Sequence, residues 1–365
     1  MRTAVRPLPW LLMLYACHAP AGAETAATAA AGSGRTLWVA PDGDDANPGT
    51  QRAPLRTLGA AAARAAAGGA AGTTVQVAPG IYQENVKTTA SGRAGARVRY
   101  LSTVKWGARI VGSGTEAVWI NHGRHVEIAG FDLSGSGRIG LLNYGSWVRM
   151  RDNHVHDVQV SGGCTGDGGG GIVNANYKGS HGEIVGNVVH DIGVPGSCNG
   201  VHGIYYSNLH GRIENNIVYR AASWGIHLWH AADQVLITRN TVFANGSDRM
   251  GGGIVVGTGD SPGGVKLTGT RIVNNIVVWN PRASIQQYCD PDDPCIGAGN
   301  VVADNVVYGN GVGIQMRVGK ATGTIADDPR FVDFRPDGSG NYRLKRGSPA
   351  TGYGAAIDID TDSKR

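Results

Sequence analysis

The sequence predicts an all-β solenoid, in which short parallel strands stack as the rungs of a coil. Three observations lead to this prediction: a repeat built on asparagine, a second repeat built on Gly-Ile that alternates with it, and the abundance of glycine. Glycine accounts for 58 of the 365 residues without a collagen-like period, so it must serve turns and close contacts. Repeats with a period of about 20–50 residues are the signature of such coils.

The first repeat places an asparagine inside short segments rich in Val and Ile. The segments MRDNHVHD, IVGNVVHD, IENNIVYR, ITRNTVFA, IVNNIVVW and VADNVVYG align Asn153, Asn187, Asn216, Asn240, Asn275 and Asn305. Alternating apolar residues bounded by Gly and Asn are typical of strands, and one rung can bury its apolar face only by stacking on another. We expect each Asn amide to hydrogen-bond the rungs on either side, at the strand spacing of about 4.8 Å.

The second repeat predicts a separate sheet of the same coil. The segments GGIVNA, HGIYYS, WGIHLW, GGIVVG, ASIQQY and VGIQMR align Gly171, Gly203, Gly225, Gly253, Ser284 and Gly313. The shortest step, from Gly203 to Gly225, is 22 residues. Longer steps carry their extra residues mainly between an Asn segment and the next Gly-Ile segment, which predicts long loops along one side of the Gly-Ile sheet.

The two ends of the chain are expected to lie outside the coil. Residues 1–23, with an arginine pair before the apolar run LPWLLMLYA, are typical of a cleaved secretory signal. The alternative is an outer-membrane lipoprotein signal, with Cys17 of LYAC acylated. Residues 24–35 predict a low-complexity linker, 36–354 the solenoid domain and 355–365 a C-terminal tail. The predicted location is therefore secreted or periplasmic.

The cysteine count and the net charge indicate disulfide bonds and limit the classes of binding partner. Four cysteines follow the leader, an even number that suggests disulfides in an exported chain. Cys289 and Cys295 would close the small loop CDPDDPC, which leaves Cys164 to pair with Cys198. Without the leader the formal charge falls from +5 to about +3, which is compatible with binding an acidic polymer. The sequence lacks the dense basic stripe of a nucleic-acid-binding protein, so nucleic-acid binding is not expected. We expect no membrane span after the leader, and a monomer.

Both ends of the predicted solenoid carry segments typical of caps. LWVAPDGDDANPGTQRAPLRTLG and the later VAPGIYQENV predict a first strand, a short capping helix and an opening rung, and they resemble the N-terminal cap of the right-handed parallel β-helix proteins of the pectate-lyase superfamily. DPRFVDFRPDGSGNYRLKRGSPATGYG resembles the matching C-terminal segment, so the likeness covers residues 36 to 354. It implies a carbohydrate substrate lying along the Gly-Ile sheet, but the fold hosts many reactions.

Strand alternation predicts which side chains of the Gly-Ile sheet face solvent. If the isoleucines point inward, Tyr205 and His227 point outward as neighbours on adjacent rungs, with Trp229 beside them. The glycine before each isoleucine is expected to face outward too, as part of a bare groove floor. The competing interpretation is that these rings only stack as a ladder that stabilises the sheet.

Other histidines are interpreted as structural. His156 and His190 align with aromatic positions on a third sheet, away from the groove, and ring stacking is the favoured interpretation. His227 and His230 are three residues apart on a strand and thus on opposite faces, so zinc binding by both is not expected.

The residue types of the Gly-Ile sheet favour elimination over hydrolysis. A glycoside hydrolase ordinarily needs two carboxyl groups across the scissile bond, and the Gly-Ile strands between residues 170 and 231 contain no Asp or Glu. β-Elimination from a uronic-acid polymer instead needs a group that neutralises the sugar carboxylate, a base and an acid. Histidine and tyrosine can supply the proton transfers, so the favoured function is a polysaccharide lyase acting on an acidic, uronate-containing glycan.

Thirteen residues are assigned to the expected site. The expected catalytic residues are His227 and Tyr205 as the proton-transfer pair, His202 as a second proton carrier, and Lys178 and Arg249 as bases or carboxylate partners. The expected substrate-binding residues are Trp229, Trp224, Tyr177, Asn174, Asn176, Gln286, Arg317 and His230. Aromatic members stack on sugar rings, and polar members hydrogen-bond or pair with the carboxylate.

No cofactor is expected, with calcium as the alternative. Several lyases of the resembled superfamily use a calcium ion held by acidic residues, but the central rungs lack a matching acidic cluster, and DPDD at 290–293 is peripheral. The alternative functions are a glycoside hydrolase, a uronate epimerase and a non-catalytic carbohydrate-binding β-helix.

Overall fold

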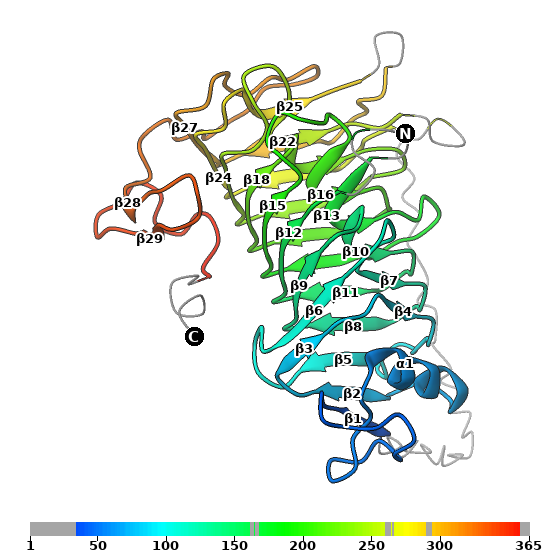
Figure 1. Cartoon of the computed structure of the whole chain (residues 1–365). Helices are drawn as coiled ribbons and strands as arrows, with labels where there is room; N and C mark the ends of the chain where they lie inside the picture. The colour runs from blue at the N-terminus through cyan, green and yellow to red at the C-terminus, as the bar shows by residue number, and fades with distance from the viewer. Residues whose placement is uncertain are drawn as a thin grey trace, which may run out of the picture. The chain divides into compact units, whose positions relative to one another are not determined.

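Three long parallel sheets form the sides of a right-handed parallel β-helix, as predicted (Figure 1). The structure is a computed structural model, which describes residues 34–160, 164, 168–259, 264, 266–289 and 294–357. These residues belong to one compact unit, Ser33–Arg365. The predicted signal peptide with Cys17, nearly all of the linker and most of the tail lie outside the described residues, and so do the acidic residues of 290–293.

Each turn of the coil contributes one strand to each sheet, and every neighbouring pair within the three sheets is parallel. The ten-stranded sheet consists of β1 (Thr36–Val39), β2 (Thr74–Val77), β5 (Val98–Ser102), β8 (Val126–Ala129), β11 (Arg149–Arg151), β14 (Glu183–Val185), β17 (Arg212–Glu214), β20 (Leu236–Thr238), β23 (Arg271–Val273) and β26 (Val301–Ala303). The nine-stranded sheet consists of β3 (Gly80–Tyr82), β6 (Ala108–Gly112), β9 (Asp132–Gly135), β12 (His154–Val158), β15 (Val188–Ile192), β18 (Ile217–Ala221), β21 (Thr241–Phe243), β24 (Ile276–Val278) and β27 (Val306–Tyr308).

The predicted Gly-Ile sheet is the eight-stranded sheet. It consists of β4 (Val86–Thr88), β7 (Trp119–Asn121), β10 (Ile139–Asn143), β13 (Gly169–Asn174), β16 (Val201–Tyr206), β19 (Trp224–Leu228), β22 (Gly252–Val256) and β25 (Ala283–Gln287). The inward isoleucines are fully buried in one continuous core that runs along the coil. Stacking of the rungs therefore creates the core, as expected for a solenoid.

A short helix, α1 (Leu58–Ala67), packs at the N-terminal end of the coil, where a capping helix is predicted. Its first turn is held by two side chains: Thr57 Oγ1 accepts from the Ala60 N–H (3.1 Å), and the Glu84 carboxylate accepts from the Leu58 N–H (2.8 Å). Its leucine and three alanines are buried. Within the described ranges, no helix has the length and apolar character needed to cross a membrane.

The predicted asparagine column is confirmed, at the turn from the ten-stranded to the nine-stranded sheet. All six members are fully buried. Asn216 is typical: its Nδ2 donates to Oδ1 of Asn240 (2.9 Å), and its own Oδ1 accepts from the backbone N–H (2.9 Å) and Nδ2 (3.0 Å) of Asn187. The residue before it, Asn215, has a φ of 55°, a left-handed conformation that turns the chain sharply. Each amide thus satisfies backbone groups that the tight turn would leave unpaired.

The glycine column does not form a groove floor, which corrects the prediction from alternation. A Cβ on Gly203 would lie 2.4 Å from Cγ1 of Val218 in the nine-stranded sheet and 2.7 Å from the carbonyl oxygen of Gly225. Gly203 and the fully buried Ile204 both point inward, so β16 holds one residue more than strict alternation allows. These glycines let the two sheets approach each other at the corner of the coil.

Replacing Gly203 with Ala should lower the free energy of unfolding by about 1–3 kcal/mol, because the new methyl group overpacks the corner against Val218. Gly313 is the matched control: it occupies the last position of the same column, and a Cβ there would meet nothing within 4 Å. Urea unfolding followed by circular dichroism measures both variants. Equal stability of the two would contradict the inward direction of Gly203.

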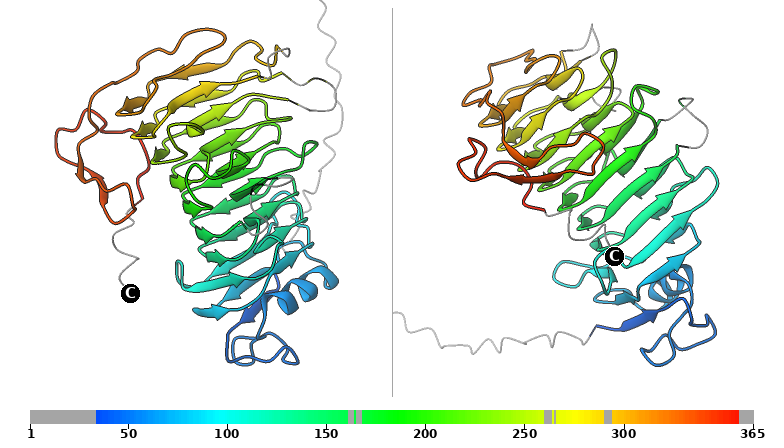
Figure 2. Two further views of the ribbon diagram at one scale, coloured as in Figure 1. Left: turned by 45° about the horizontal axis from the view of Figure 1, so that its top comes forward. Right: turned by 60° about the vertical axis from the view of Figure 1, so that its left-hand side comes forward.

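The C-terminal residues fold back along the outer face of the nine-stranded sheet (Figure 2). Here β28 (Phe331–Asp333) and β29 (Asn341–Leu344) form an antiparallel pair, and Tyr342 stacks on Phe243 with ring centroids 4.7 Å apart. Beyond β29, the Ala355 N–H donates to Oγ1 of Thr241 (2.9 Å). The segment therefore covers the second half of this sheet.

Both predicted disulfides are present. Cys164–Cys198 joins the segments that precede β13 and β16, and Cys289–Cys295 closes its own small loop. The first bond thus ties together two of the long loops beside the eight-stranded sheet, as expected.

Candidate active site on the eight-stranded sheet

Tyr205 on β16 and His227 on β19 lie side by side on the outer face of the eight-stranded sheet, as alternation predicted. They are register partners, and each is half-buried, whereas their neighbours Ile204 and Leu228 are fully buried. The two rings meet edge to face, with centroids 5.2 Å apart and planes at 88°. A phenol and an imidazole are thus held in contact on the solvent side of a rigid sheet.

His202 is also on this outer face, because the extra inward residue in β16 reverses the alternation before Gly203. Its ring stacks on Tyr205 (5.6 Å), and its Nε2 lies 2.9 Å from Nδ1 of His227. Only 4% of His202 is exposed. His202, the predicted second proton carrier, is therefore a buried residue that hydrogen-bonds His227.

The hydrogen bonds of His202 fix the tautomer of both rings. The backbone N–H of Trp224 donates to Nδ1 of His202 (3.4 Å), so a neutral His202 carries its proton on Nε2. That Nε2–H then donates to Nδ1 of His227. A neutral His227 consequently presents an Nε2–H group, which is a hydrogen-bond donor and not a base.

Burial keeps both imidazoles neutral. Loss of solvent lowers the pKa of His202 to about 3. Burial also lowers the pKa of His227 well below its ordinary value, and the neighbouring His202 and His230 lower it further. His227, expected as one half of the proton-transfer pair, is therefore a neutral hydrogen-bond donor in this structure.

These depressed pKa values predict that acidification destabilises the fold. The unfolded chain protonates each histidine near pH 6.5, whereas the folded chain protonates His202 only near pH 3. Between these values the unfolded state binds more protons than the folded state. The free energy of unfolding therefore decreases as the pH is lowered, by about 1.4 kcal/mol per pH unit for each such histidine. His202→Gln should show a shallower slope in urea unfolding between pH 7 and 4.5; an unchanged slope would show that His202 is not held neutral.

His230 has the opposite tautomer. Its Nδ1 lies 3.0 Å from the carbonyl oxygen of Gly259, which only accepts, so Nδ1 carries the proton and a neutral ring has its lone pair on Nε2. The ring packs against the exposed Tyr177 (4.3 Å, planes tilted by 33°) and lies 6.2 Å from the ring of Tyr205. His230 therefore reaches the same cluster as His227, which corrects the expected opposite faces, because it stands beyond the last residue of β19. The site thus combines one imidazole that donates with another that accepts.

A further aromatic surface extends from His227 along the sheet. The ring of Trp229 lies 5.9 Å from that of His227 and 5.4 Å from that of Tyr288. Its indole covers Gly257 and Gly259, where a Cβ would lie 2.8 Å and 2.3 Å from ring atoms. The expected role of Trp229 as a stacking surface for sugar rings fits this position.

Three of the expected substrate-binding residues are engaged in the protein itself. Asn174 is fully buried in a second asparagine row, where its Oδ1 accepts from Nδ2 of Asn143 (2.5 Å). Trp224 is 8% exposed and packs with Val255 and Ala283. The amide of Asn176 bonds the backbone of Tyr144 and Lys178. Asn174 and Trp224 therefore do not fit direct contact with substrate, because both lie out of solvent.

The expected cations and Gln286 surround the site at its margins. Lys178 is exposed and follows Tyr177 in the loop after β13. Arg249 is exposed in the turn before β22. Gln286 is half-buried on β25, two strands from His227, and the Arg317 side chain donates to the carbonyl of Cys289 (3.3 Å). The structure thus places the aromatic and imidazole rings of the expected site in contact with one another, whereas the expected lysine and arginines lie outside these contacts.

The comparisons with solved structures show the fold. A pectate lyase, Pel9A, superimposes with a TM-score of 0.61 at 16% identity, over 87% of this chain and 90% of that chain. A rhamnogalacturonan lyase superimposes with a TM-score of 0.57 at 14% identity, over 90% of this chain and 96% of that chain.

Two sequence comparisons cover smaller parts of the chain. Residues 41–90, which include α1, match a family described as a protein of unknown function (DUF1565). Over 146 residues, or 36% of this chain, the sequence is 33% identical to the uncharacterized protein YwoF of Bacillus subtilis (strain 168), and the match spans 30% of that protein. The three stacked parallel sheets and the superpositions make this chain a right-handed parallel β-helix protein with the pectate-lyase fold.

Proposed function

We propose that this protein is a secreted or periplasmic polysaccharide lyase that cleaves an acidic, uronate-containing glycan by β-elimination. The observation that carries the proposal is the in-register contact of Tyr205 and His227 on the outer face of the sheet, with His202 fixing the tautomer of His227. The fold shared with two lyases supports the reaction class, and two disulfides are typical of an oxidising compartment.

The tautomers divide the roles among three rings. The Nε2–H of His227 donates to the substrate carboxylate, whose negative charge grows as the neighbouring carbon loses its proton. The lone pair on Nε2 of His230 takes that proton. The Tyr205 hydroxyl gives a proton to the departing glycosidic oxygen, and Lys178 can pair with the carboxylate from the adjoining loop.

The elimination balances without a redox partner. The electron pair of the broken C–H bond forms a carbon–carbon double bond while the bond from the next carbon to the glycosidic oxygen breaks. That oxygen leaves as a hydroxyl with the proton from Tyr205. Solvent then takes the proton from His230 and returns one to the Tyr205 phenolate. The products are one chain with a new reducing end and one with an unsaturated terminal sugar.

A panel of uronate polymers, incubated with the purified protein with and without chelator, tests the proposal. A lyase produces ultraviolet absorbance from the unsaturated sugar together with new reducing ends. Loss of that absorbance in Tyr205→Phe and unchanged rates after chelation would support the metal-free proton transfer.

The other functions give different results in the same experiment. Reducing ends without ultraviolet absorbance would identify a hydrolase, and altered uronate stereochemistry without cleavage would identify an epimerase. Retention of the polymer without any product would identify a binding module, for which Trp229, Tyr288 and Tyr177 provide stacking surfaces. Each of these outcomes would overturn the lyase proposal.

A further inference from the structure

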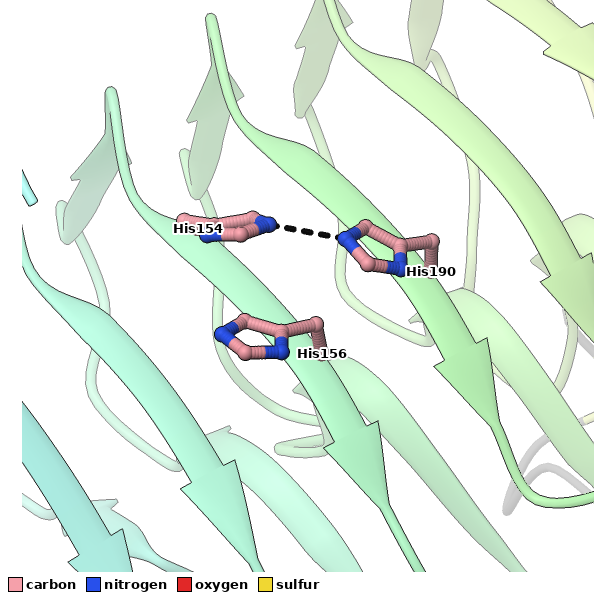
Figure 3. Close-up of side chains that lie close together, drawn as sticks. All are labelled: His154, His156 and His190. Atoms are coloured by element: carbon pink, nitrogen blue, oxygen red, sulfur yellow. Dashed lines mark hydrogen bonds between the residues drawn. The ribbon is translucent and has the colours of Figure 1, made fainter. Parts of the chain in front are cut away.

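Three histidines gather on the outer face of the nine-stranded sheet, a different side of the coil from the proposed active site (Figure 3). His154 and His156 come from β12, and His190, the register partner of His156, comes from β15. The rings of His156 and His190 stack (5.3 Å), as the sequence predicted. Their ligand nitrogens, with that of His154, nevertheless all lie within 4.8 Å of one another.

Each of the three rings has its Nδ1 against a carboxylate oxygen. The distances are 3.0 Å for His154–Asp132, 2.7 Å for His156–Asp157 and 2.6 Å for His190–Asp191. Because a carboxylate only accepts, each Nδ1 carries the proton, and a neutral ring has its lone pair on Nε2. A carboxylate on the far nitrogen is the usual support of a metal-binding histidine, because it fixes the tautomer and the direction of the ring.

Two close contacts involve the Nε2 atoms of these rings. Nε2 of His154 lies 2.7 Å from Nε2 of His190, so two lone pairs face each other. Nε2 of His156 lies 3.1 Å from Oδ2 of Asp132, again lone pair against lone pair. Both contacts are repulsive unless positive charge is placed between the atoms. A divalent cation held by the His154–His190 pair removes the first repulsion, and its charge also offsets the buried Asp132 carboxylate.

Asp132 gives a second indication of a ligand. It is 8% exposed, and its buried Oδ1 accepts no hydrogen bond. The Arg109 guanidinium is the cation paired with this oxygen, at 3.9 Å, which is too far for a hydrogen bond. A buried carboxylate oxygen without a donor is costly unless a metal ion or similar charge occupies its lone pair.

We propose that His154, His156 and His190 bind one divalent transition-metal ion of the zinc type, beside the Asp132 carboxylate that holds Nδ1 of His154. Imidazole nitrogens suit zinc, cobalt, nickel and copper, and do not suit calcium or magnesium. Tetrahedral nitrogens at about 2.0–2.1 Å from zinc stand about 3.3 Å apart, so the His154–His190 pair needs to open by only about 0.6 Å.

The surroundings hold these rings in place while leaving them reachable. Trp106 lies against His154 (4.7 Å), and Tyr219 stacks on His190 (4.6 Å), so an aromatic ring walls each end of the cluster. Arg220 fixes Asp191 behind His190, at 2.5 Å. The side chains of His154, His156 and His190 keep 19%, 15% and 15% exposure, which admits an ion from solvent.

Isothermal titration of untagged, chelator-treated protein with Zn²⁺ alone tests the proposal. We expect one ion per chain, with a Kd in the micromolar range or tighter, and no comparable response to Ca²⁺. His154→Ala and His190→Ala should each weaken binding by at least 100-fold. Cobalt(II) should give the visible absorption of a four-coordinate, nitrogen-rich site, and this readout requires no variant.

Two controls separate this site from scattered surface histidines and from misfolding. His122, which is exposed and stacks on Tyr144, is the matched control, and His122→Ala should bind zinc as the wild type does. Asp191→Asn keeps all three imidazoles and should weaken binding about 10–100-fold. Absence of zinc binding by the wild type, or equal binding by the His190→Ala variant, would overturn the proposal, whatever activity the other sheet shows.

Discussion

Replacing His227 with alanine is expected to reduce cleavage of an acidic glycan by at least about 100-fold, because the substrate carboxylate loses its preorganised hydrogen-bond donor. The fold should lose only about 1–3 kcal/mol, since His227 is half-buried and its removal mainly leaves one N–H of His202 without a partner. Initial rates at saturating polymer and the thermal midpoint measure the two effects separately.

The controls for His227 keep the surrounding rings intact. Tyr205→Phe removes one hydroxyl and should cause a similar loss of rate with the same thermal midpoint. His122→Ala changes an exposed histidine on the turn after β7, three strands from β16, and should leave the rate unchanged. A large fall in the thermal midpoint of His227→Ala, with the rate of the remaining folded protein preserved, would return His227 to a purely structural role.

Replacing Asn240 with alanine is expected to lower the free energy of unfolding by about 3–5 kcal/mol, the largest effect of any single substitution considered. Its Oδ1 accepts from both the backbone N–H and the Nδ2 of Asn216, and its Nδ2 donates to the carbonyls of Ile213 and Thr238 and to Asn275. All of these groups are buried, so each loses a partner that water cannot replace.

Asn341→Ala is the matched control for this prediction. Asn341 lies on β29, and its Oδ1 accepts from the backbone N–H and the guanidinium of the nearby Arg343. We expect a change within about 0.5 kcal/mol there. Urea unfolding of both variants measures the difference, and similar stabilities would mean that the column adds little beyond the apolar core.

The sequence was sufficient to predict the architecture because the same strand pattern recurs in successive rungs, so each repeat supports the assignment of the others. The asparagine column, both disulfides and the outward pair of Tyr205 and His227 all follow from spacing and alternation. Asn174 was misplaced although it stands two residues after the inward Ile172, a parity that already points it into the coil.

The remaining errors arise from local backbone geometry and from contacts across rungs. Gly203 and Ile204 both point inward, which shifts the alternation by one residue, so the glycines turn inward and His202 turns outward. The tautomers depend on partners 22 and 29 residues away, which no local pattern reveals. His154 was overlooked, although it shares a strand face with His156 in NHVHD.

The backward course of the C-terminal residues imposes an order on folding during synthesis. The bonds of Ala355 to Thr241 and of Ala356 to Asn215 span 114 and 141 positions, so they close only after residues 355 and 356 have left the ribosome. Until then the aromatic faces of Tyr219 and Phe243 are bare, and nascent chains present them to one another. A chain truncated after residue 330 would therefore form the coil without this cover and is expected to self-associate.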